Sequence, residues 1–241
     1  MNKIVLVTGG SRGIGKATSI ELAKQGYFVC INYRVDVESA KCLEEQIKKD
    51  GGKALAIKAD ISDEKDVLKL FEQIDKLEGA LLGLINNAGI LAEQSPLAQM
   101  TSDRIRKTFD INVIGTFLCS KEAIKRMVTN GGSIVNISSG ASKSGSPNEY
   151  IDYASTKGAI DTFTVGLAKE VAEQNIRVNA IRPGFIETEM HIIPNRLETI
   201  KSNIPMKRVG QPIEIAKTIA WLLSDNSSYT TGAIIDIAGG K

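Results

Sequence analysis

The sequence predicts an α/β fold, in which a doubly wound parallel sheet of about seven strands carries helices on both of its faces. Short runs rich in Val and Ile alternate along the chain with longer segments that have helical spacing. The short runs are apolar on both faces, which suits buried parallel strands. The length of 241 residues is sufficient for one α/β domain with a full core. A single domain over residues 1–241 is therefore expected.

The order of the elements follows from these runs. Strands are expected at residues 4–8, 28–33, 54–59, 82–87, 133–138, 177–181 and 233–237. Helices are expected at residues 36–50, 64–77, 103–128, 154–172 and 213–223. The rhythm breaks at residues 186–212, where three prolines fall in an irregular pattern. Long irregular inserts are often lids or binding elements, so this segment is expected to be either a substrate lid or a plain surface excursion.

Composition excludes several classes of partner. Lys and Arg total 30 against 28 Asp and Glu, which gives a formal charge of +2. This balance leaves no electrostatic footprint for nucleic acid or for an anionic membrane, and the apolar stretches are too short to span a bilayer. With one histidine, His191, the chain is not expected to hold a metal ion.

Cysteine usage indicates the compartment. Cys30, Cys42 and Cys119 are odd in number and form no CxxC pair. Cys30 and Cys119 lie in apolar or helical runs and are expected to be small core residues. Because a disulfide framework is not indicated, a reducing cytoplasm is the expected location.

A glycine-rich turn lies between the first strand and the first helix. Residues 8–15 read Thr-Gly-Gly-Ser-Arg-Gly-Ile-Gly. Glycines allow positive φ and let the backbone approach a ligand, and the start of a helix presents free N–H groups to a pyrophosphate. The spacing G-x-x-x-G-x-G differs from the general dinucleotide fingerprint. The turn by itself therefore leaves a purely structural role open, but its place between strand and helix favours cofactor binding.

Together with further motifs, this turn is similar to the short-chain dehydrogenase/reductase family, and the similarity covers essentially the whole chain. The turn matches the TGxxxGxG cofactor loop, residues 86–89 match the NNAG segment, and Pro183-Gly184 match the PG motif. The catalytic tetrad of the family is matched by Asn112, Ser139, Tyr153 and Lys157. The resemblance implies a single-domain Rossmann fold, an NAD(P)-dependent enzyme acting on CH–OH groups of a small molecule, and a homotetramer.

The resemblance also implies which residues hold the cofactor. The glycine turn contributes Thr8, Gly9, Ser11, Arg12, Gly13, Ile14 and Gly15. Asp60 and Ile61 would contact the adenine ring, although Asp60 is as readily explained as a residue near a helix start. The adenine ribose would be lined by Asn87, Ala88 and Gly89. The nicotinamide side would be formed by Tyr153, Lys157, Pro183, Gly184, Ile186 and Thr188.

The end of the second expected strand bears on the choice between NAD and NADP. The acidic residue that binds the ribose 2′-hydroxyl of NAD is expected there, but the strand ends in Asn32, Tyr33 and Arg34. Arg34 and Arg12 could grip a 2′-phosphate through charge-assisted hydrogen bonds. The alternative is two solvated surface arginines. NADP(H) is the expected cofactor, with NAD(H) as a second possibility.

Tyr153 and Lys157 are spaced to act together. They are four residues apart on an expected helix, so their side chains share one face. A phenol has a pKa near about 10 and is a poor base at neutral pH. An ammonium about 4 Å away would supply a Coulomb term of about 4 kcal/mol, so Lys157 is expected to lower the pKa of Tyr153. Tyr150 lacks such a lysine and is expected either to face the substrate or to pack.

Ser139 and Asn112 complete the expected catalytic group. Ser138 and Ser139 end the fifth expected strand, where active-site groups of such sheets collect, and Ser139 fits the family position better. Its hydroxyl can hydrogen-bond a substrate oxygen as negative charge develops there. Asn112 stands in an expected helix, where asparagine is a poor choice; in the family this residue disturbs the helix and holds a water that links the lysine to solvent. The expected reaction moves a hydride between the nicotinamide and a carbonyl carbon while Tyr153 transfers the proton.

Several specific activities stay open. The chain is similar both to 3-oxoacyl-carrier-protein reductases and to sugar dehydrogenases such as glucose 1-dehydrogenase. A carrier-protein partner would need a basic patch, for which the candidates are Lys143, Arg196, Lys201, Lys207 and Arg208. Scattered surface charge is the simpler interpretation of these residues. A dinucleotide-binding sensor without catalysis is a distant alternative, because this chain keeps all four tetrad residues.

Overall fold

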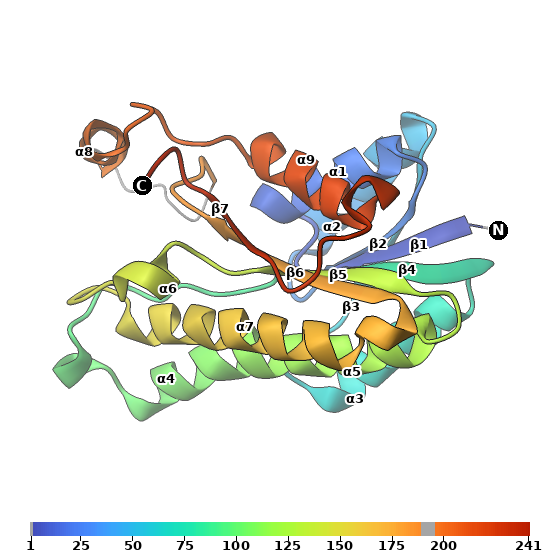
Figure 1. Ribbon diagram of the computed structural model, residues 1–241, viewed down its shortest axis with the longest axis horizontal. Coiled ribbons are helices and arrows are strands. Elements are labelled where there is room, and N and C mark those ends of the chain that lie inside the picture. Colours follow the sequence, from blue (N-terminus) through green and yellow to red (C-terminus); the bar gives the residue numbers. More distant parts are fainter. Residues whose placement is uncertain (1, 189–195) are drawn as a thin grey trace.

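The computed structural model describes residues 2–188 and 196–241. Its centre is a seven-stranded sheet with the strand order β3-β2-β1-β4-β5-β6-β7 (Figure 1). Every neighbouring pair of strands is parallel. The strands are β1 (Asn2–Val7), β2 (Phe28–Tyr33), β3 (Lys53–Lys58), β4 (Gly79–Asn86), β5 (Gly132–Ile137), β6 (Ile176–Pro183) and β7 (Ile234–Ile237).

Helices cover both faces of this sheet. In the view of Figure 1, α1, α2 and α9 lie above the sheet, and α3, α4, α5 and α7 lie below it. The helices are α1 (Gly13–Lys24), α2 (Val37–Lys49), α3 (Glu64–Asp75), α4 (Ser102–Phe109), α5 (Gly115–Met127), α6 (Ala141–Ser144), α7 (Ile151–Glu170), α8 (Arg196–Asn203) and α9 (Pro212–Leu223). The expected doubly wound α/β fold is confirmed.

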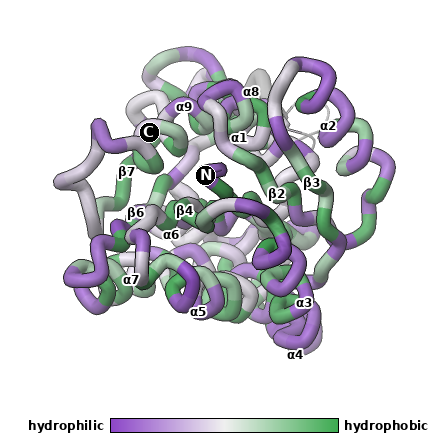
Figure 2. The backbone as a smooth tube through the Cα atoms, turned by 90° about the vertical axis from the view of Figure 1, so that its right-hand side faces the viewer, coloured by the Kyte–Doolittle hydropathy of each residue, from purple (hydrophilic) through white to green (hydrophobic). Residues whose placement is uncertain are grey.

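The strands are buried on both faces, so their side chains feed two separate cores. Ile4 and Leu6 of β1 belong to the core between the sheet and helices α3 and α5. Val5 and Val7 belong to the core between the sheet and helices α1 and α9. This alternation follows from the two-residue period of a strand. Figure 2 shows the result, with hydrophobic strands at the centre and polar residues along the outer helices. Cys30 and Cys119 are fully buried in the first core, as expected.

The strand order reverses between β1 and β4, and this point defines where a ligand can bind. Chain connections leave to one side through β2 and β3 and to the other through β5, β6 and β7. Open α/β sheets bind ligands outside the carboxyl ends of the strands at such a reversal. The glycine turn and the NNAG segment both lie here, at the carboxyl ends of β1 and β4.

The helical segment expected at residues 103–128 is confirmed, and a π-helical turn lies within it. The structure divides it into α4, a π-helical segment (Asp110–Ile114) and α5. Asn112 lies in the π segment, where its side chain exchanges two hydrogen bonds with the backbone of Ile90. π-helical turns are rare and occur mostly at functional sites, and here the Asn112 amide lies opposite the loop that follows β4.

The irregular segment after β6 is only partly described. Ile186 forms an isolated bridge with Gly210, and Ile200, Ile204 and Val209 pack with Phe185 in a small third core. Residues 189–195, including His191, lie outside the described residues. Whether the segment is a lid or a surface excursion therefore stays a prediction. Across the described part of the chain, no helix is long and apolar enough to cross a membrane.

Candidate active site

The glycine turn after β1 is held in place by hydrogen bonds from the neighbouring strand ends. The Asn87 side-chain amide donates to the carbonyl oxygens of Thr8 and Gly9 at 2.9 and 3.0 Å. The Thr8 hydroxyl accepts from the amides of Asn87 and Ala88, each at 3.0 Å. From the other side, Asn32 Oδ1 accepts from the Gly9 amide at 3.3 Å. The turn is thus fixed by neutral amide and hydroxyl groups.

This turn fits a dinucleotide, because its glycines adopt positive φ or leave no room for a Cβ. Gly9 and Gly13 both have positive φ, at 59° and 51°. A Cβ on Gly15 would overlap the carbonyl oxygen of Gly9. Within the described residues, the N-cap residue Arg12 places no side-chain hydrogen bond on the start of α1. A helix start without a side-chain cap is suited to an anionic phosphate group.

The loop after β6 closes over the same turn. A Cβ on Gly13 would lie 3.4 Å from Cγ2 of Thr188, so the structure brings the expected nicotinamide-side loop next to the expected phosphate turn. Ile186 and Pro183 are buried, and Gly184 is packed against Ala238. The amide of Gly140, after β5, donates to the carbonyl oxygen of Pro183 at 3.0 Å, which joins the two strand ends.

The two arginines expected to bind a 2′-phosphate both face carboxylates. Arg34 Nη1 donates to Asp60 Oδ2 at 3.4 Å, and Arg12 Nε lies 4.0 Å from Asp36 Oδ2. Burial raises the pKa of Asp60, but its hydrogen bonds with Ser62 and the charge of Arg34 lower it overall. Tyr33 is buried at the end of β2. The local charge at this end of the site is therefore balanced rather than strongly positive.

Asp60 and Ile61 have structural roles that the sequence did not separate from adenine binding. The Asp60 carboxylate accepts from the amide and the hydroxyl of Ser62, and the N-cap of α3 is Asp63. Ile61 is buried in the core, where a Cβ on Gly115 would meet its side chain. Their expected contact with the adenine ring stays a prediction.

The four tetrad residues lie together: Asn112 and Lys157 flank Gly89, and Tyr153 lies beside Lys157 and Ser139. A Cβ on Gly89 would lie 3.2 Å from Asn112 Oδ1 and 3.6 Å from Lys157 Nζ. Asn112 Nδ2 also donates to Thr156 Oγ1 at 3.2 Å, which links the π segment to α7. The sequence motifs are far apart in the chain, and the carboxyl ends of the parallel strands bring them together.

Lys157 is buried, and Asp161 is the charged group that acts on its pKa. Its Nζ donates to the carbonyl oxygen of Ile137 at 2.7 Å and lies 5.5 Å from the centroid of the Tyr153 ring. Burial lowers the pKa of Lys157 to about 8, and Asp161, one helical turn further along α7, raises it. A lysine with such a pKa can exchange its proton close to neutral pH.

The Ser139 side chain lies close enough to the Tyr153 hydroxyl to lower the pKa of that group. Ser139 also accepts from the Ala141 amide at 3.1 Å, whereas the Ser138 hydroxyl donates to the Lys157 carbonyl oxygen; the preference for Ser139 over Ser138 agrees with this geometry. Burial raises the pKa of Tyr153 above its ordinary value, by more than Ser139 lowers it. The expectation of a lowered pKa is wrong for this structure, because desolvation of the phenolate outweighs the effect of Ser139.

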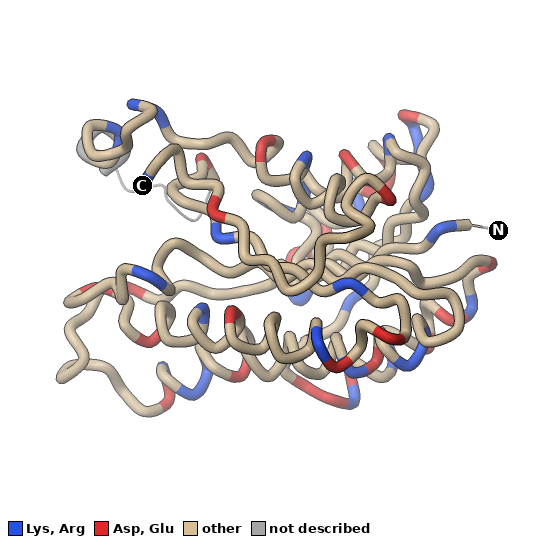
Figure 3. Tube along the Cα trace, viewed as in Figure 1, with Lys and Arg blue, Asp and Glu red and all other residues tan. Residues whose placement is uncertain are grey.

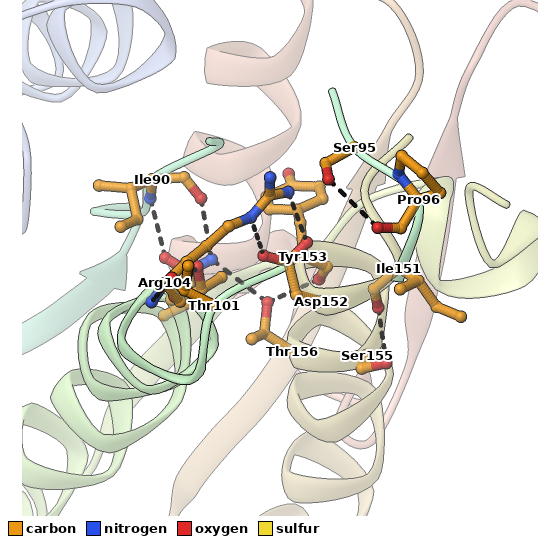
Figure 4. A network of polar contacts seen from close by, with 12 residues as sticks. Ile90, Ser95, Pro96, Thr101, Arg104, Ile151, Asp152, Tyr153, Ser155 and Thr156 are labelled. Carbon is orange, nitrogen blue, oxygen red and sulfur yellow. Dashed lines mark hydrogen bonds and ion pairs between the residues drawn. The ribbon is translucent and has the colours of Figure 1, made fainter. Parts of the chain in front are cut away.

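Sequence reasoning missed the residues that hold the start of α7. Asp152, next to Tyr153, forms a buried ion pair with Arg104 of α4 (Figure 4). Thr156 donates to the Tyr153 carbonyl oxygen at 2.6 Å. Tyr150, for which the sequence left packing and substrate contact open, is buried. An acidic residue beside the tyrosine in a helix was a visible signal, but nothing in the sequence identified its partner.

Clusters that could bind a metal ion were expected to be absent. In residues 2–188 and 196–241, no group of three or more His, Cys, Asp and Glu side chains is arranged to hold one. The candidate site is built from a glycine turn, a tyrosine–lysine pair, a serine and an asparagine.

Sequence similarity to known proteins extends over the whole chain. A family model described as "Enoyl-(Acyl carrier protein) reductase" matches residues 9–241. "Uncharacterized oxidoreductase YgfF" of Escherichia coli (strain K12) is 54% identical over 245 residues, which cover 99% of this chain and 99% of that protein. "Glucose 1-dehydrogenase 2" of Bacillus subtilis (strain 168) is 37% identical, over 99% of this chain and 94% of its own. "3-oxoacyl-[acyl-carrier-protein] reductase FabG" of Staphylococcus aureus (strain Mu50) is 37% identical, over 100% and 98%.

These matches agree with the order and the placement of the motifs. The glycine turn, the NNAG segment and the tyrosine–lysine pair lie at one edge of the sheet. The chain belongs to the short-chain dehydrogenase/reductase family, and it is an oxidoreductase of the kind that binds a nicotinamide cofactor.

Proposed function

We propose that this enzyme is an NADP(H)-dependent oxidoreductase that transfers a hydride between the nicotinamide and a carbonyl or secondary alcohol carbon of a small substrate, with Tyr153 as the proton donor and acceptor. The observation that carries the proposal is the convergence of Ser139, Tyr153, Lys157 and Asn112 beside the glycine turn. When bound, the cofactor supplies or accepts the hydride.

The residues divide the remaining work. The Ser139 and Tyr153 hydroxyls polarise the substrate oxygen, and Tyr153 gives it a proton during reduction. The raised pKa of Tyr153 keeps its proton in place at neutral pH, so the side chain is a ready donor. Lys157 Nζ lies 5.5 Å from the centroid of the ring, and the lysine pKa of about 8 lets it return a proton to the tyrosine. Asn112 borders this route and is fixed by the Ile90 backbone.

The preference for NADP(H) rests on Arg12 and Arg34. Both lie beside the end of β2, and Tyr33 occupies the place where an acidic residue would bind the ribose of NAD. Their neighbours Asp36 and Asp60 offset part of this charge. NADP(H) is therefore the preferred cofactor of the proposal, with NAD(H) as a usable second one.

The specific substrate separates two candidate activities. The relatives include a carrier-protein reductase and a glucose dehydrogenase. Two members of the expected basic patch are neutralised, because Lys143 pairs with Asp236 at 3.0 Å and Arg208 pairs with Glu214 at 2.7 Å. Figure 3 shows acidic and basic residues interleaved in the same way over the visible helices. Charge balance at this edge favours a small carbonyl compound over an acidic carrier protein.

The proposal also includes a homotetrameric assembly and a cytoplasmic location. An aromatic pair, Phe117 and Phe163, joins α5 to α7 with ring centroids 4.1 Å apart. Phe117 is 46% exposed and Val128 is 54% exposed, which supports a homotetramer built on these helices and on the edge strand β7. All three cysteines are free, which supports a reducing cytoplasm. The mass of the protein in solution tests the tetramer.

Turnover of NADPH with carbonyl substrates tests the proposed function. The wild-type protein is expected to oxidise NADPH with members of a panel that contains an acetoacetyl thioester and small ketones, and to reduce NADP⁺ with glucose if it acts on sugars. Tyr153→Phe is expected to lower kcat by about 10²- to 10⁴-fold while NADPH binding, followed by its fluorescence, stays within about twofold, since the variant removes only one hydroxyl. A Tyr153→Phe enzyme with wild-type kcat would overturn the role of this residue.

A further inference from the structure

Tyr153 lies between two residues whose side chains are held from α4 and the π segment. Asp152 precedes it in the chain, and the carbonyl oxygen of Tyr153 accepts from the hydroxyl of Thr156 at 2.6 Å. Both of these side chains are in turn bound by the segment that runs from α4 into α5. Arg104 binds Asp152 (Figure 4), and eight residues later Asn112 binds Thr156 at 3.2 Å.

The Arg104–Asp152 contact has the geometry of a strong ion pair. Arg104 Nε donates to Asp152 Oδ2 at 2.9 Å, and Nη2 donates to Oδ1 at 3.2 Å. Bidentate pairs of this kind fix orientation as well as distance. The Arg104 side chain is 16% exposed and that of Asp152 is 2% exposed, so solvent screens the pair little.

The ion pair lies at the first turn of α7. In the described residues, the N-cap residue Tyr150 gives this helix no side-chain cap. Asp152 is the acidic residue of the first turn, a position where a negative charge is favourable. Burial raises the pKa of Asp152, but Arg104 and the amides of Tyr153 and of Asp152 itself lower it overall, so the carboxylate is charged at neutral pH. Without Arg104, a buried charge would be left unpaired beside the catalytic tyrosine.

Arg104 itself is fixed before it reaches Asp152. Its amide donates to Thr101 Oγ1, the N-cap of α4, at 3.2 Å. Its carbonyl oxygen accepts from Thr108 Oγ1 at 2.9 Å. Arg104 therefore lies on a capped helix rather than on a loop. Residues on helices and strands hold a catalytic group more precisely than residues on loops do.

We propose that Arg104 is a positioning residue for Tyr153, which it aligns through Asp152 at the start of α7. This inference rests on the proposed function of Tyr153 as proton donor and acceptor. Arg104 and Asn112 then form two supports, one through Asp152, the residue before Tyr153, and one through Thr156, which binds the Tyr153 carbonyl oxygen. Small displacements of a catalytic group can cost about 10²-fold in rate. Loss of one support is therefore expected to lower kcat, whereas loss of an ordinary structural ion pair is expected to lower only the melting temperature.

The test compares Arg104 with a second bidentate arginine. Arg126 binds Asp75 at 2.7 Å through both Nε and Nη2 and joins α5 to α3, away from the tetrad. Arg104→Met is expected to lower kcat about 10- to 100-fold, with the dissociation constant of NADPH within about twofold. Arg104→Lys, which keeps the charge, is expected to recover part of the loss. Arg126→Met is expected to lower the melting temperature without lowering kcat.

A double variant and an exchange measurement complete the test. Arg104→Met/Asp152→Asn is expected to lose no more kcat than Arg104→Met, because both changes break one pathway. Hydrogen exchange at residues 151–157 is expected to speed up in Arg104→Met and not in Arg126→Met, and this readout needs no substrate. Wild-type kcat in Arg104→Met, additive losses in the double variant, or unchanged exchange would each overturn the inference. A wild-type protein inactive on every carbonyl would instead count against the proposed function, while the exchange result would still decide the role of Arg104.

Discussion

The two ends of the active site are held together by different physical means. At the glycine turn, Asn87, Thr8 and Asn32 fix the backbone through neutral hydrogen bonds, and the arginines around it are exposed and paired with carboxylates. At the catalytic end, the charged groups are buried: Lys157 is 4% exposed and Asp152 is 5% exposed. The glycine turn is therefore expected to recognise the cofactor by shape, and the catalytic end to depend on buried charges.

This difference follows from what each end must do. A cofactor that enters and leaves needs a rigid backbone surface and charges that solvent can reach. A proton donor needs a low-dielectric environment, where small changes in neighbouring charge alter a pKa strongly. The turn should therefore be sensitive to added volume, and the catalytic end to removed charge.

The largest effect is expected when volume is added to the turn. Gly15→Ala places a Cβ against the Gly9 carbonyl oxygen and 2.6 Å from Asn87 Nδ2. Overpacking of this kind costs about 1–3 kcal/mol, and the displaced turn is expected to weaken NADPH binding by about 100-fold, since each 1.4 kcal/mol is about tenfold. Fluorescence titration with NADPH measures it.

The matched control is another glycine replaced by alanine in the same fold. Gly166, in α7, has open space where its Cβ would go, so Gly166→Ala is expected to leave NADPH binding unchanged and to stabilise the helix by up to about 1 kcal/mol. Equal NADPH affinities for Gly15→Ala and wild type would contradict a shape-selective turn.

A smaller effect is expected when a charge is changed at the exposed end. Arg34→Asp removes the partner of Asp60 and sets two carboxylates beside each other. Charge-assisted hydrogen bonds contribute about 1.5–3 kcal/mol each, so the Michaelis constant for NADPH is expected to rise about 10- to 100-fold, and that for NADH far less. Steady-state kinetics with both cofactors provide the comparison.

Asp60→Asn is expected to change cofactor preference in the opposite direction. It releases Arg34 from its carboxylate partner, so the Michaelis constant for NADPH divided by that for NADH is expected to fall. Arg34→Asp kinetics that change equally for NADPH and NADH would sink the assignment of Arg34 to a 2′-phosphate.

The sequence predicted the features that are local in the chain. Runs of Val and Ile identified the strands, the glycine spacing identified the turn, and the interval between Tyr153 and Lys157 placed both on one helical face. All three depend on the periods of helices and strands or on backbone sterics, which a short stretch of sequence contains.

The features that the sequence did not predict depend on partners far away in the chain. Arg104 and Asp152 are 48 residues apart, and the two arginines of the cofactor end face Asp36 and Asp60. The second case had a usable signal: Asp60 follows β3, which is the neighbour of β2 in the sheet. The error on the pKa of Tyr153 came from assigning full weight to the lysine charge and none to burial.

The smallest effect is expected from a carboxylate next to the catalytic lysine. Asp161 Oδ2 accepts from Arg182 Nε at 3.0 Å, while its Oδ1 is buried and accepts no hydrogen bond from the described residues. Burial lowers the pKa of Lys157 to about 8, and Asp161 opposes this. Asp161→Asn removes the opposing charge, so the pKa of Lys157 is expected to fall below about 8.

The consequence is a change in the pH dependence of turnover with little change in its maximum. As pH rises, Lys157 loses its proton earlier in Asp161→Asn than in wild type, so carbonyl reduction is expected to decline at lower pH, with a loss of a few-fold at most near pH 8. A ¹³C-lysine titration followed by NMR, with Lys157→Arg to assign the signal, measures the pKa without any substrate. Asp75→Asn, which breaks the Arg126 pair instead, should leave that midpoint in place. If the Lys157 midpoint is the same in Asp161→Asn and wild type, the charge of Asp161 does not reach the catalytic end, and the contrast between the two ends is one of burial alone.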